Sequence, residues 1–430
     1  MRVLVAGANG LIGSAVVARL LAAGHEVVGV ARDTARPTRR VPAARWLAID
    51  IAAATRPEDW LPQLAGVDAV VNCAGVLQDS ARDSTRAVHV DGAGALFAAC
   101  ERAGVRRVVQ ISAIGVDRGP VTSFAATKRE GDEALMRRDL DWVILRPSVV
   151  LGPVAYGGSA LLRGLAALPV LPVMPDTGEL QVVQIEDVAA TVEFFLASDA
   201  PTRLALDLAG PERLSVTEIA SRYRAWLGWP EPRLVAVPAW LAAMAYRFGD
   251  FAGWLGWRPP LRTTARQELS RGAVGDPEPW TALTGIVPQS LGAALLRRPA
   301  SVQERWFAAL YLLKPVVFAG LALLWMVTGL LSLWPWYATG VGLIQEPGAG
   351  LLSGPAVIVG GVLDIAVGAA IAYRRTARRG LWAALLVSVC YVAAGSLLAS
   401  RLWADPLGPF LKILPIVVLH LVALAIVEDR

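Results

Sequence analysis

Along the first 150 residues, short apolar runs alternate with longer stretches in which apolar residues recur every three or four positions. The apolar runs are 3–6, 27–31, 46–49, 69–73, 108–112 and 142–145, and the helical patterns between them include 11–23, 87–103 and 124–137. Near-continuous apolar strands separated by helices are typical of a buried parallel sheet with helices on both faces. The pattern therefore predicts an α/β doubly wound parallel sheet.

A different pattern begins at residue 306. Four apolar stretches follow, at about 315–334, 354–373, 380–400 and 406–427. Each is close to the ~20 residues that a helix needs to cross a bilayer. Between residues 315 and 345 the only ionisable side chain is Tyr337. We therefore expect an all-α domain of four transmembrane helices at 306–430, after a hinge at 296–305.

The arginines predict how these helices are oriented. Basic residues precede the first stretch and fill the link between the second and third, whereas the loop 335–353 has none. Cytoplasmic loops carry the excess of Lys and Arg, so we expect both termini to be cytoplasmic in a multi-pass protein of the inner (plasma) membrane. The chain enters a strand at once, without the flanks of a signal peptide. The basic positions are Arg297, Arg298, Arg305, Lys314, Arg374, Arg375, Arg378 and Arg379.

Composition narrows the classes of function. Hydrophobic residues make up 55% of the 430 residues, and the mean hydropathy is +0.49, which favours a membrane part. The formal charge of +5 comes without basic runs interleaved with aromatics, so no nucleic-acid partner is expected. Cys73, Cys100 and Cys390 are too widely spaced for a disulfide framework or a metal-ligand set.

The turn after the first strand carries the clearest chemistry. Gly7, Gly10 and Gly13 stand between an apolar strand and a helix that begins at Leu11. Such glycines permit a sharp turn, close approach of a pyrophosphate to the backbone, and tight packing of helix on strand. The helix N-terminus then offers free amides to the anion. The turn predicts a dinucleotide site.

The end of the second strand bears on which nicotinamide cofactor binds. Ala31 stands where an NAD-type acidic residue usually falls, and Arg32 follows it. An arginine here accommodates a 2′-phosphate, whereas a carboxylate accepts from a ribose 2′-hydroxyl. We favour NADP(H) over NAD(H), and Asp33 is the residue that could retain NAD binding.

Further residues follow the other strands: Asp50-Ile51, Asn72-Cys73-Ala74-Gly75, Ser112, Thr127-Lys128, Arg146-Pro147-Ser148, and Gln184-Ile185-Glu186-Asp187-Val188. In combination with the glycine turn, this set resembles the extended, NAD-dependent epimerase/dehydratase-like branch of the short-chain dehydrogenase/reductase family. The resemblance covers about residues 1–290. It implies an NAD(P)-binding Rossmann domain at 1–295, with the core at 1–150 and a substrate-side part at 150–295.

The resemblance also implies roles for particular residues. In that family the asparagine-alanine-glycine stretch lines the cofactor, and the aspartate after strand three contacts adenine. The implied cofactor-binding residues are Gly7, Asn9, Gly10, Leu11, Ile12, Gly13, Arg32, Asp50, Ile51, Asn72, Ala74, Gly75, Ser112, Lys128, Pro147 and Ser148.

The catalytic pattern of the family is incomplete. The family places a tyrosine four residues before its lysine as the proton donor, with a serine that orients the carbonyl. Here Ser112 and Lys128 are present as candidate catalytic residues, but Phe124 occupies the tyrosine position. Tyr156 is a speculative substitute acid, and Thr122, Ser123 and Thr127 offer poorer hydroxyl groups. Members without the tyrosine are called atypical, and some resemble the dinucleotide-binding accessory subunit of respiratory complex I.

A run of aromatic residues at 238–257 has helical spacing. A helix with such a stripe either packs on its own domain or rests on a bilayer surface. We expect core packing. The stripe consists of Trp240, Met244, Phe248, Phe251, Trp254 and Trp257.

The last 125 residues, with the ending Asp405-Pro406-Leu407-Gly408-Pro409 through Lys412 to His420, resemble the DoxX-like family, named for a quinone-linked membrane subunit. Charged groups inside a membrane usually mark a site or a polar clasp. Asp364 and His420 lie at similar predicted depths and could pair, or Lys412 could reach Asp364.

Two hypotheses of function follow. The first is a membrane-anchored oxidoreductase that faces the cytoplasm and acts on a lipophilic substrate such as a quinone or isoprenoid lipid. The second is a non-catalytic dinucleotide-binding module, structural or regulatory, of a membrane complex. In both, the lipid bilayer is a partner, and a homo-oligomer is possible.

Overall fold

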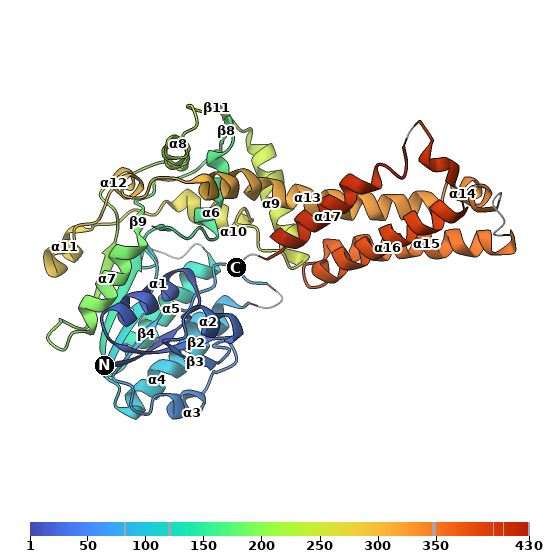
Figure 1. Cartoon of the computed structure of the whole chain (residues 1–430). Coiled ribbons are helices and arrows are strands. Elements are labelled where there is room, and N and C mark those ends of the chain that lie inside the picture. The colour runs from blue at the N-terminus through green and yellow to red at the C-terminus, as the bar shows by residue number, and fades with distance from the viewer. Residues whose placement is uncertain (81–82, 119–121, 346–349, 399, 407, 429–430) are drawn as a thin grey trace. The chain divides into compact units, whose positions relative to one another are not determined.

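The computed structural model describes residues 1–430 except 81–82, 119–121, 346–349, 399, 407 and 429–430. The chain forms two compact units (Figure 1). The first, the nucleotide unit, comprises Met1–Asp250 and Pro259–Ala308, and the second, the helical unit, comprises Phe251–Arg258 and Ala309–Arg430. The division near Ala308 falls inside a helix that begins at Val302, within the expected hinge 296–305. The helical unit also includes a short segment from residue 251 to 258.

The nucleotide unit is built on a seven-stranded sheet in the order β10-β6-β5-β4-β1-β2-β3, and every pairing in it is parallel. Its strands are β1 (Arg2–Ala6), β2 (Glu26–Ala31), β3 (Arg45–Ala48), β4 (Ala69–Asn72), β5 (Arg107–Ile111), β6 (Asp141–Pro147) and β10 (Leu204–Leu208). The six predicted strands are confirmed within one residue at most ends. The seventh, β10, lies beyond residue 150, so the Rossmann sheet continues into the region expected to be substrate-side.

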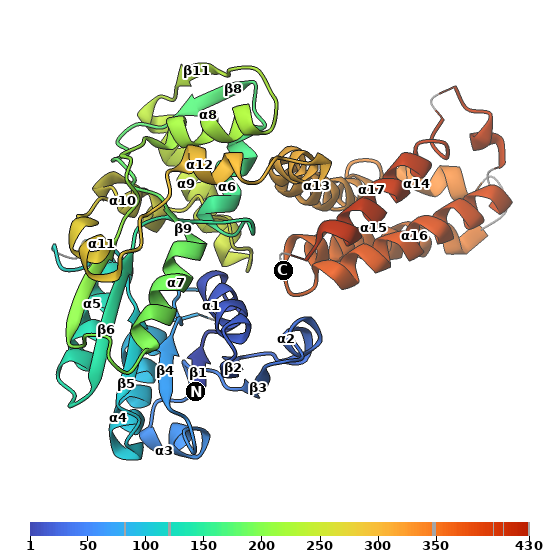
Figure 2. The same cartoon turned by 60° about the vertical axis from the view of Figure 1, so that its left-hand side comes forward.

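The alternation of side chains along β1 explains why helices cover both faces of the sheet. Val3 and Val5 belong to a core shared with α1 (Leu11–Ala22) and α7 (Ile185–Leu196). Leu4 and Ala6 point into a second core, shared with α3 (Pro57–Trp60) and α4 (Ala93–Ala103). Figure 2 shows α7 beside α1 on one face of the sheet. Parallel strands place all their carboxyl ends, and hence the site, at one edge.

The other helices and strands up to Leu296 have at most 16 residues each, and the helix Ala239–Trp254 crosses from the nucleotide unit into the helical unit. They are α2 (Ala35–Arg40), a π-helical turn (Ala87–Gly92), α5 (Ser123–Met136), β7 (Val150–Leu151), α6 (Gly158–Ala166), β8 (Val170–Val173), β9 (Val183–Gln184), α8 (Val216–Trp226), β11 (Arg233–Ala236), α9 (Ala239–Trp254), α10 (Thr263–Arg271), α11 (Glu278–Thr284) and α12 (Leu291–Leu296). Strand β7 pairs with β9 and β8 with β11, in two small parallel sheets.

The helical unit contains α13 (Val302–Leu333), α14 (Tyr337–Ile344), α15 (Ser353–Ala372), α16 (Ala377–Leu398) and α17 (Ile413–Ile426). Within the described residues, three of these, α13, α15 and α16, are long and apolar enough to cross a membrane. Helix α17 has only 14 residues, fewer than the ~20 that span the hydrocarbon core. Residues 399 and 407, which fall in the third and fourth expected spans, lie outside the described part of the chain.

Small residues bring the apolar helices close together. A Cβ atom added to Gly329 would lie 2.4 Å from the carbonyl oxygen of Gly361, and one added to Gly368 would lie 2.7 Å from that of Ala322. In a bilayer, such close contacts rather than the hydrophobic effect hold helices together.

The polar groups of the helical unit pair differently from the prediction. Asp364 accepts a hydrogen bond from the Tyr391 hydroxyl at 2.8 Å, and Nε2 of His420 accepts one from the Trp325 indole at 2.9 Å. The ring of His420 also contacts the carbonyl of Ile416 through Nδ1 at 2.7 Å. The expected pairing of Asp364 with His420 or Lys412 is thus replaced by two separate polar contacts, each with an aromatic residue of a neighbouring helix.

The prediction that the aromatic stripe packs into a core is wrong for all its members except Trp257, which lies beyond the end of α9 and packs against Phe318. Trp240, Phe248 and Trp254 are 66%, 68% and 76% exposed, and the buried face of the helix is instead formed by small residues and one tyrosine. That buried face comprises Ala242, Tyr246 and Gly249.

Candidate functional site

The glycine turn closes tightly against the end of β4. Gly7 has a φ of +70°, and a Cβ added to it would lie 2.8 Å from the backbone nitrogen of Ala74. A Cβ on Gly13 would lie 2.2 Å from the carbonyl oxygen of Gly7. Helix α1 begins at Leu11 with no side-chain cap on Gly10 and no acidic residue in its first turn. Its first amides therefore remain suited to an anion.

The other predicted residues of this turn, Asn9, Leu11 and Ile12, lie at its surface. Asn9 is exposed, and Leu11 and Ile12 are partly exposed at the start of the helix. The structure thus brings the whole predicted turn to the edge where the strands end.

Asn72 shapes the neighbouring loop from within. Its side-chain oxygen accepts from the amide of Ala74 at 3.1 Å, and its Nδ2 donates to Oε1 of Gln110 at 2.8 Å. The side chain is buried. The structure therefore gives Asn72 a supporting role, in which it fixes the backbone at Ala74 and Gly75.

Lys128 joins the ends of two strands. Its ammonium group donates to the carbonyl oxygens of Ile111, at 2.8 Å, and Ala74, at 3.2 Å. A Cβ added to Gly75 would lie 3.3 Å from Nζ. Because an ammonium has three donors, one remains for a ligand. The predicted residues Ala74, Gly75 and Lys128 thus converge on one point.

His89, which sequence reasoning missed, lies beside this point. Its Nε2 accepts from the amide of Val76 at 3.0 Å, which assigns the proton to Nδ1 and makes that atom the donor to Oγ1 of Thr127 at 2.9 Å. The Thr127 hydroxyl in turn donates to the carbonyl of Ser123 at 2.7 Å. Phe124 packs edge-on against the His89 ring, with 5.7 Å between the ring centroids. The only signal in the sequence was a histidine in the helix after β4.

Ser112 is directed to a second residue that the sequence analysis missed, Asp132. The Ser112 hydroxyl donates to Oδ2 of Asp132 at 2.7 Å, and Nε of Arg146 lies 3.6 Å from the same oxygen. Arg146 also binds Asp117 at 2.6 Å. Asp132 is the fourth residue after Lys128, and residues four apart lie on the same side of a helix. This spacing is the signal in the sequence that could have identified Asp132.

Burial sets the protonation of these groups. It raises the pKa of Asp132 to about 6, against the lowering effect of the bond from Ser112 and the charge of Arg146. It lowers the pKa of Lys128 to about 8, although Asp132 opposes this, and that of His89 to about 2, with Lys128 as a further cause. Lys128 is therefore mainly protonated at neutral pH, and His89 is neutral.

Two of the hydroxyl groups that could replace the tyrosine, those of Thr122 and Thr127, are engaged elsewhere. Thr122 caps α5 by accepting from the amide of Ala125, and its hydroxyl binds the carboxylate of Glu268. The Ser148 hydroxyl donates to the carbonyl of Ala273 at 2.7 Å, and Pro147 accepts from the amide of Ile114. Tyr156 lies in the turn before α6, where its backbone binds Ser159.

The residues expected to set the preference for NADP(H) or NAD(H) follow β2, and Asp50 follows β3. Arg32 is half exposed, and its Nη1 binds Oδ1 of Asp83 at 2.7 Å. The Asp33 carboxylate accepts from the amide of Ala35 at the start of α2. Asp50 is exposed, and its Oδ1 accepts from the amide of Ala52, while the adjacent Ile51 is buried.

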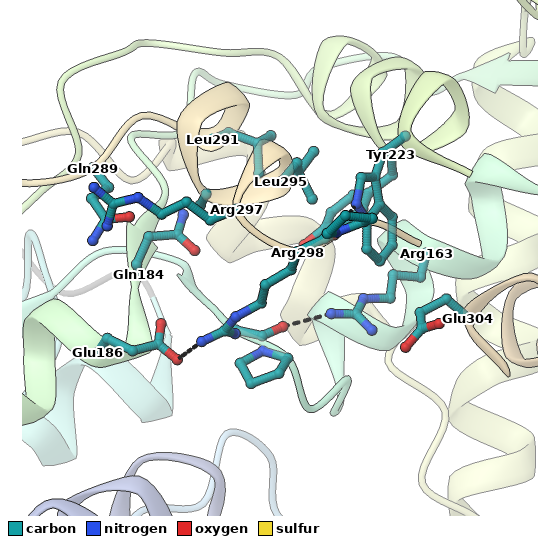
Figure 3. A pocket seen from close by; sticks show the side chains of 15 residues that line it. Arg163, Gln184, Glu186, Tyr223, Gln289, Leu291, Leu295, Arg297, Arg298 and Glu304 are labelled. Atoms are coloured by element: carbon teal, nitrogen blue, oxygen red, sulfur yellow. Dashed lines mark hydrogen bonds and ion pairs between the residues drawn. The ribbon is translucent and has the colours of Figure 1, made fainter. Parts of the chain in front are cut away.

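A pocket with a volume of about 180 Å³ is formed by other residues of the nucleotide unit (Figure 3). Its lining includes Arg163 of α6 and Tyr223 of α8, together with Gln184 of β9 and Arg298, which follows α12. Arg298 binds Glu186 at 2.8 Å across it, and Arg163 donates to the carbonyl of Gly152. None of the residues implied as cofactor-binding lines this pocket.

Comparison with known families decides what the two units are. Residues 7–158 match the NAD(P)H-binding family, and residues 322–421 match the DoxX-like family. The chain is an NAD(P)-binding Rossmann domain joined to a DoxX-like domain. The NAD(P)-binding match spans the glycine turn, Lys128 and Ser148, but not the run 184–188 on which the resemblance was also based.

Several curated proteins resemble this Rossmann–DoxX chain. A protein of Mycobacterium tuberculosis, named only as uncharacterized, is 31% identical over 221 residues, and the chain spans just 23% of its length. Ceramide reductase of Caulobacter vibrioides is 28% identical, with 55% of this chain and 73% of that protein covered. Sterol demethylase protein B of Methylococcus capsulatus is 28% identical, with 71% of this chain and 99% of that protein covered.

Solved structures share the fold of the Rossmann domain. The UDP-glucose 4-epimerase of Thermus thermophilus, in complex with NAD, superposes with a TM-score of 0.53 at 22% identity, with 71% of this chain and 99% of that chain covered. The WbmG enzyme of Bordetella bronchiseptica, also with NAD, gives a TM-score of 0.53 at 19% identity, with 69% and 92% covered. The epimerase/dehydratase-like architecture is thus confirmed.

Proposed function

We propose that the Rossmann–DoxX protein is a membrane-anchored NAD(P)H-dependent oxidoreductase. The observation that carries the proposal is the convergence of Lys128, Gly75 and the Ser112–Asp132 pair at the edge where the glycine turn would hold a pyrophosphate. Bound there, the dinucleotide would supply a hydride. The chain's own residues then have to bind the dinucleotide, orient the substrate and deliver a proton.

Lys128 is proposed to bind the nicotinamide ribose with the donor that its two carbonyl contacts leave over. The Ser112 hydroxyl is proposed to orient the substrate carbonyl and to pass it a proton, which Ser112 recovers from protonated Asp132. With a pKa of about 6, Asp132 is protonated in a useful fraction near neutral pH. General acids act best when their pKa lies near the operating pH. In this scheme the pair takes the role of the missing tyrosine.

The proposed substrate is lipophilic, of the quinone or isoprenoid-lipid type. A membrane domain fused to a reductase domain places the site beside a lipid phase. The names of three relatives support this proposal, because ceramide reductase, sterol demethylase protein B and a 3-beta-hydroxysteroid dehydrogenase refer to lipids.

The proposed coenzyme is NADP(H). Arg32 is the first side chain beyond β2, and a guanidinium has five donors, of which the contact with Asp83 uses Nη1. Asp33 is already occupied with the amide of Ala35, which leaves it less suited to accept from a ribose hydroxyl.

The proposed location is the inner (plasma) membrane, with both termini in the cytoplasm and four crossings. The arginines next to α13 and between α15 and α16 support this orientation. As a fourth crossing, α17 would need residues that precede Ile413 in addition to its helical part.

Purified full-length protein in nanodiscs, mixed with NADPH and a panel of quinones and long-chain ketones, tests the activity. We expect NADPH oxidation that depends on one of these substrates. Tight NADPH binding without oxidation above background would reject the enzyme and favour a second function, a non-catalytic dinucleotide-binding module of a membrane complex.

The specific observation in favour of that second function is Phe124, which cannot exchange a proton. Phe124→Tyr separates the two functions. If the Ser112–Asp132 pair already delivers the proton, the added hydroxyl changes turnover little. If the site lacks only its acid, turnover rises by the roughly 10²-fold or more that a general acid contributes.

A further inference from the structure

Helix α9 presents a continuous apolar face to its surroundings. Six large apolar side chains on it are 44–76% exposed: Trp240, Leu241, Met244, Phe248, Phe251 and Trp254. At ~100° of rotation per residue they fall within about 140° of one another. Arg247 is the one charged residue of α9 on this same face. Soluble proteins rarely expose such a patch unless it binds something.

The residues that follow α9 belong to the helical unit and are held there by three contacts. The indole of Trp257 donates to the carbonyl of Ala372, the last residue of α15, at 2.7 Å. The backbone amide of Arg374 donates to the carbonyl of Leu255 at 3.0 Å. The guanidinium of Arg374 also lies over the Trp257 ring, 5.4 Å from its centroid.

These contacts hold Leu255 and Trp257, which directly follow α9, against the link between α15 and α16. Both of those helices are long enough to cross a bilayer, so the link between them lies at a membrane surface. Arg374, Arg375, Arg378 and Arg379 gather in and just after this link, and basic side chains at that level attract anionic headgroups.

We propose that α9 is an interfacial helix that lies in the plane of the membrane surface, with its exposed face buried among the lipid headgroups and upper acyl chains. Tryptophan, phenylalanine and leucine on one face are the residues that favour this boundary. Arg247 can extend its charged end to a lipid phosphate while its stem stays among apolar groups. The proposal holds whether or not the Rossmann domain turns over a substrate.

The composition of the face favours lipid over a second copy of the chain. Its residues are large rather than small, and close packing between helices in a membrane calls for small residues. Two small residues of α9, Ala242 and Gly249, lie on the opposite, buried face, where a Cβ on Gly249 would lie 1.7 Å from the carbonyl oxygen of Leu261.

The test uses the full-length protein in nanodiscs of phosphatidylcholine and phosphatidylglycerol. Cys73, Cys100 and Cys390 are replaced by alanine, and a nitrobenzoxadiazole probe is attached to M244C or F248C. Q267C, an exposed position on α10, is the matched control. Retained NADPH binding shows that each labelled variant is folded.

We expect lipids with a doxyl group near the headgroup to quench the probes at 244 and 248, and aqueous iodide to leave them bright. The probe at 267 should show the opposite behaviour. Quenching of all three probes by iodide alone would overturn the proposal, as would equal quenching of all three by lipid. In discs that hold one protein molecule, the probes at 244 and 248 could escape quenching by lipid, and in discs that hold two molecules the probes could contact each other. That pair of results would assign the face to a second copy of the chain. Because turnover is not measured, failure here leaves the proposed activity standing.

Discussion

The ammonium group of Lys128 donates a hydrogen bond of 2.8 Å to the carbonyl oxygen of Ile111, the last residue of β5. A second bond from the same group reaches Ala74, just beyond β4. Parallel strands leave such terminal carbonyls at the edge of the sheet, and here one buried cation ties two of them together. The lysine thus organises the loops of the site before any ligand arrives.

Lys128→Met should therefore weaken NADPH binding by about tenfold or more, because it removes a charged donor, worth about 1.5–3 kcal/mol, from the ribose position. Isothermal titration calorimetry of the full-length protein measures this. The control is Arg129→Met, at the next position of α5. It removes an exposed cation that pairs with Glu133, and it should change the affinity little. Equal losses in both variants would contradict a role at the site.

Gly13→Ala should destabilise the nucleotide unit by about 1–3 kcal/mol, the usual range for overpacking. The added Cβ would lie 2.2 Å from the carbonyl oxygen of Gly7, so α1 must move away from the turn. Thermal unfolding with and without NADPH reports the stability and the loss of binding. Gly94→Ala in α4, where a Cβ meets nothing within 4 Å, should instead gain about 0.5–1 kcal/mol.

The pH dependence of stability should reveal Asp132. Its folded pKa of about 6 lies above the ordinary 3.8, so between these values the folded state holds more protons and stability falls as pH rises. Above pH 6 the loss of folding stability approaches on the order of 3 kcal/mol. Asp132→Asn keeps an acceptor for Ser112 but removes the titration, so its melting temperature should fall less than that of the wild type from pH 4 to 7. Parallel profiles would refute the assignment.

The same Asp132→Asn variant should lose NADPH oxidation with its lipophilic substrate while it retains NADPH affinity, because only the proton donor is removed. Turnover of the unmodified protein should fall as pH rises through about 6. Unchanged turnover in the variant would show that Ser112 receives its proton from another source.

Arg32→Asp should move the preference from NADPH toward NADH, since a carboxylate repels a 2′-phosphate and accepts from a 2′-hydroxyl. Competition binding of both nucleotides measures the ratio. Arg39→Asp, on the exposed side of α2, makes the same change of charge farther from the end of β2 and is the control. An unchanged ratio in Arg32→Asp would show that Arg32 serves only to hold Asp83.

Much of this architecture could be read from the sequence. The six strands, the glycine turn and the helices α15 and α16 were predicted closely, whereas α13 begins at Val302, within the expected hinge. The close predictions depend on local facts: side-chain alternation, the steric freedom of glycine, and the length of an apolar run. The convergence of Gly7, Ala74 and Lys128 followed as well, since parallel strands must end at one edge.

Other features depend on which distant groups meet, and only the tertiary structure decided them. The partner of Ser112 is Asp132, that of Arg32 is Asp83, and that of Asp364 is Tyr391. A polar side chain takes whichever partner the packing brings within about 3 Å, and no local pattern encodes that choice. The apolar stripe of α9 shows the same limit, because a protein core and a lipid boundary select the same residues. Its exposure became evident only once the fold had used the opposite face.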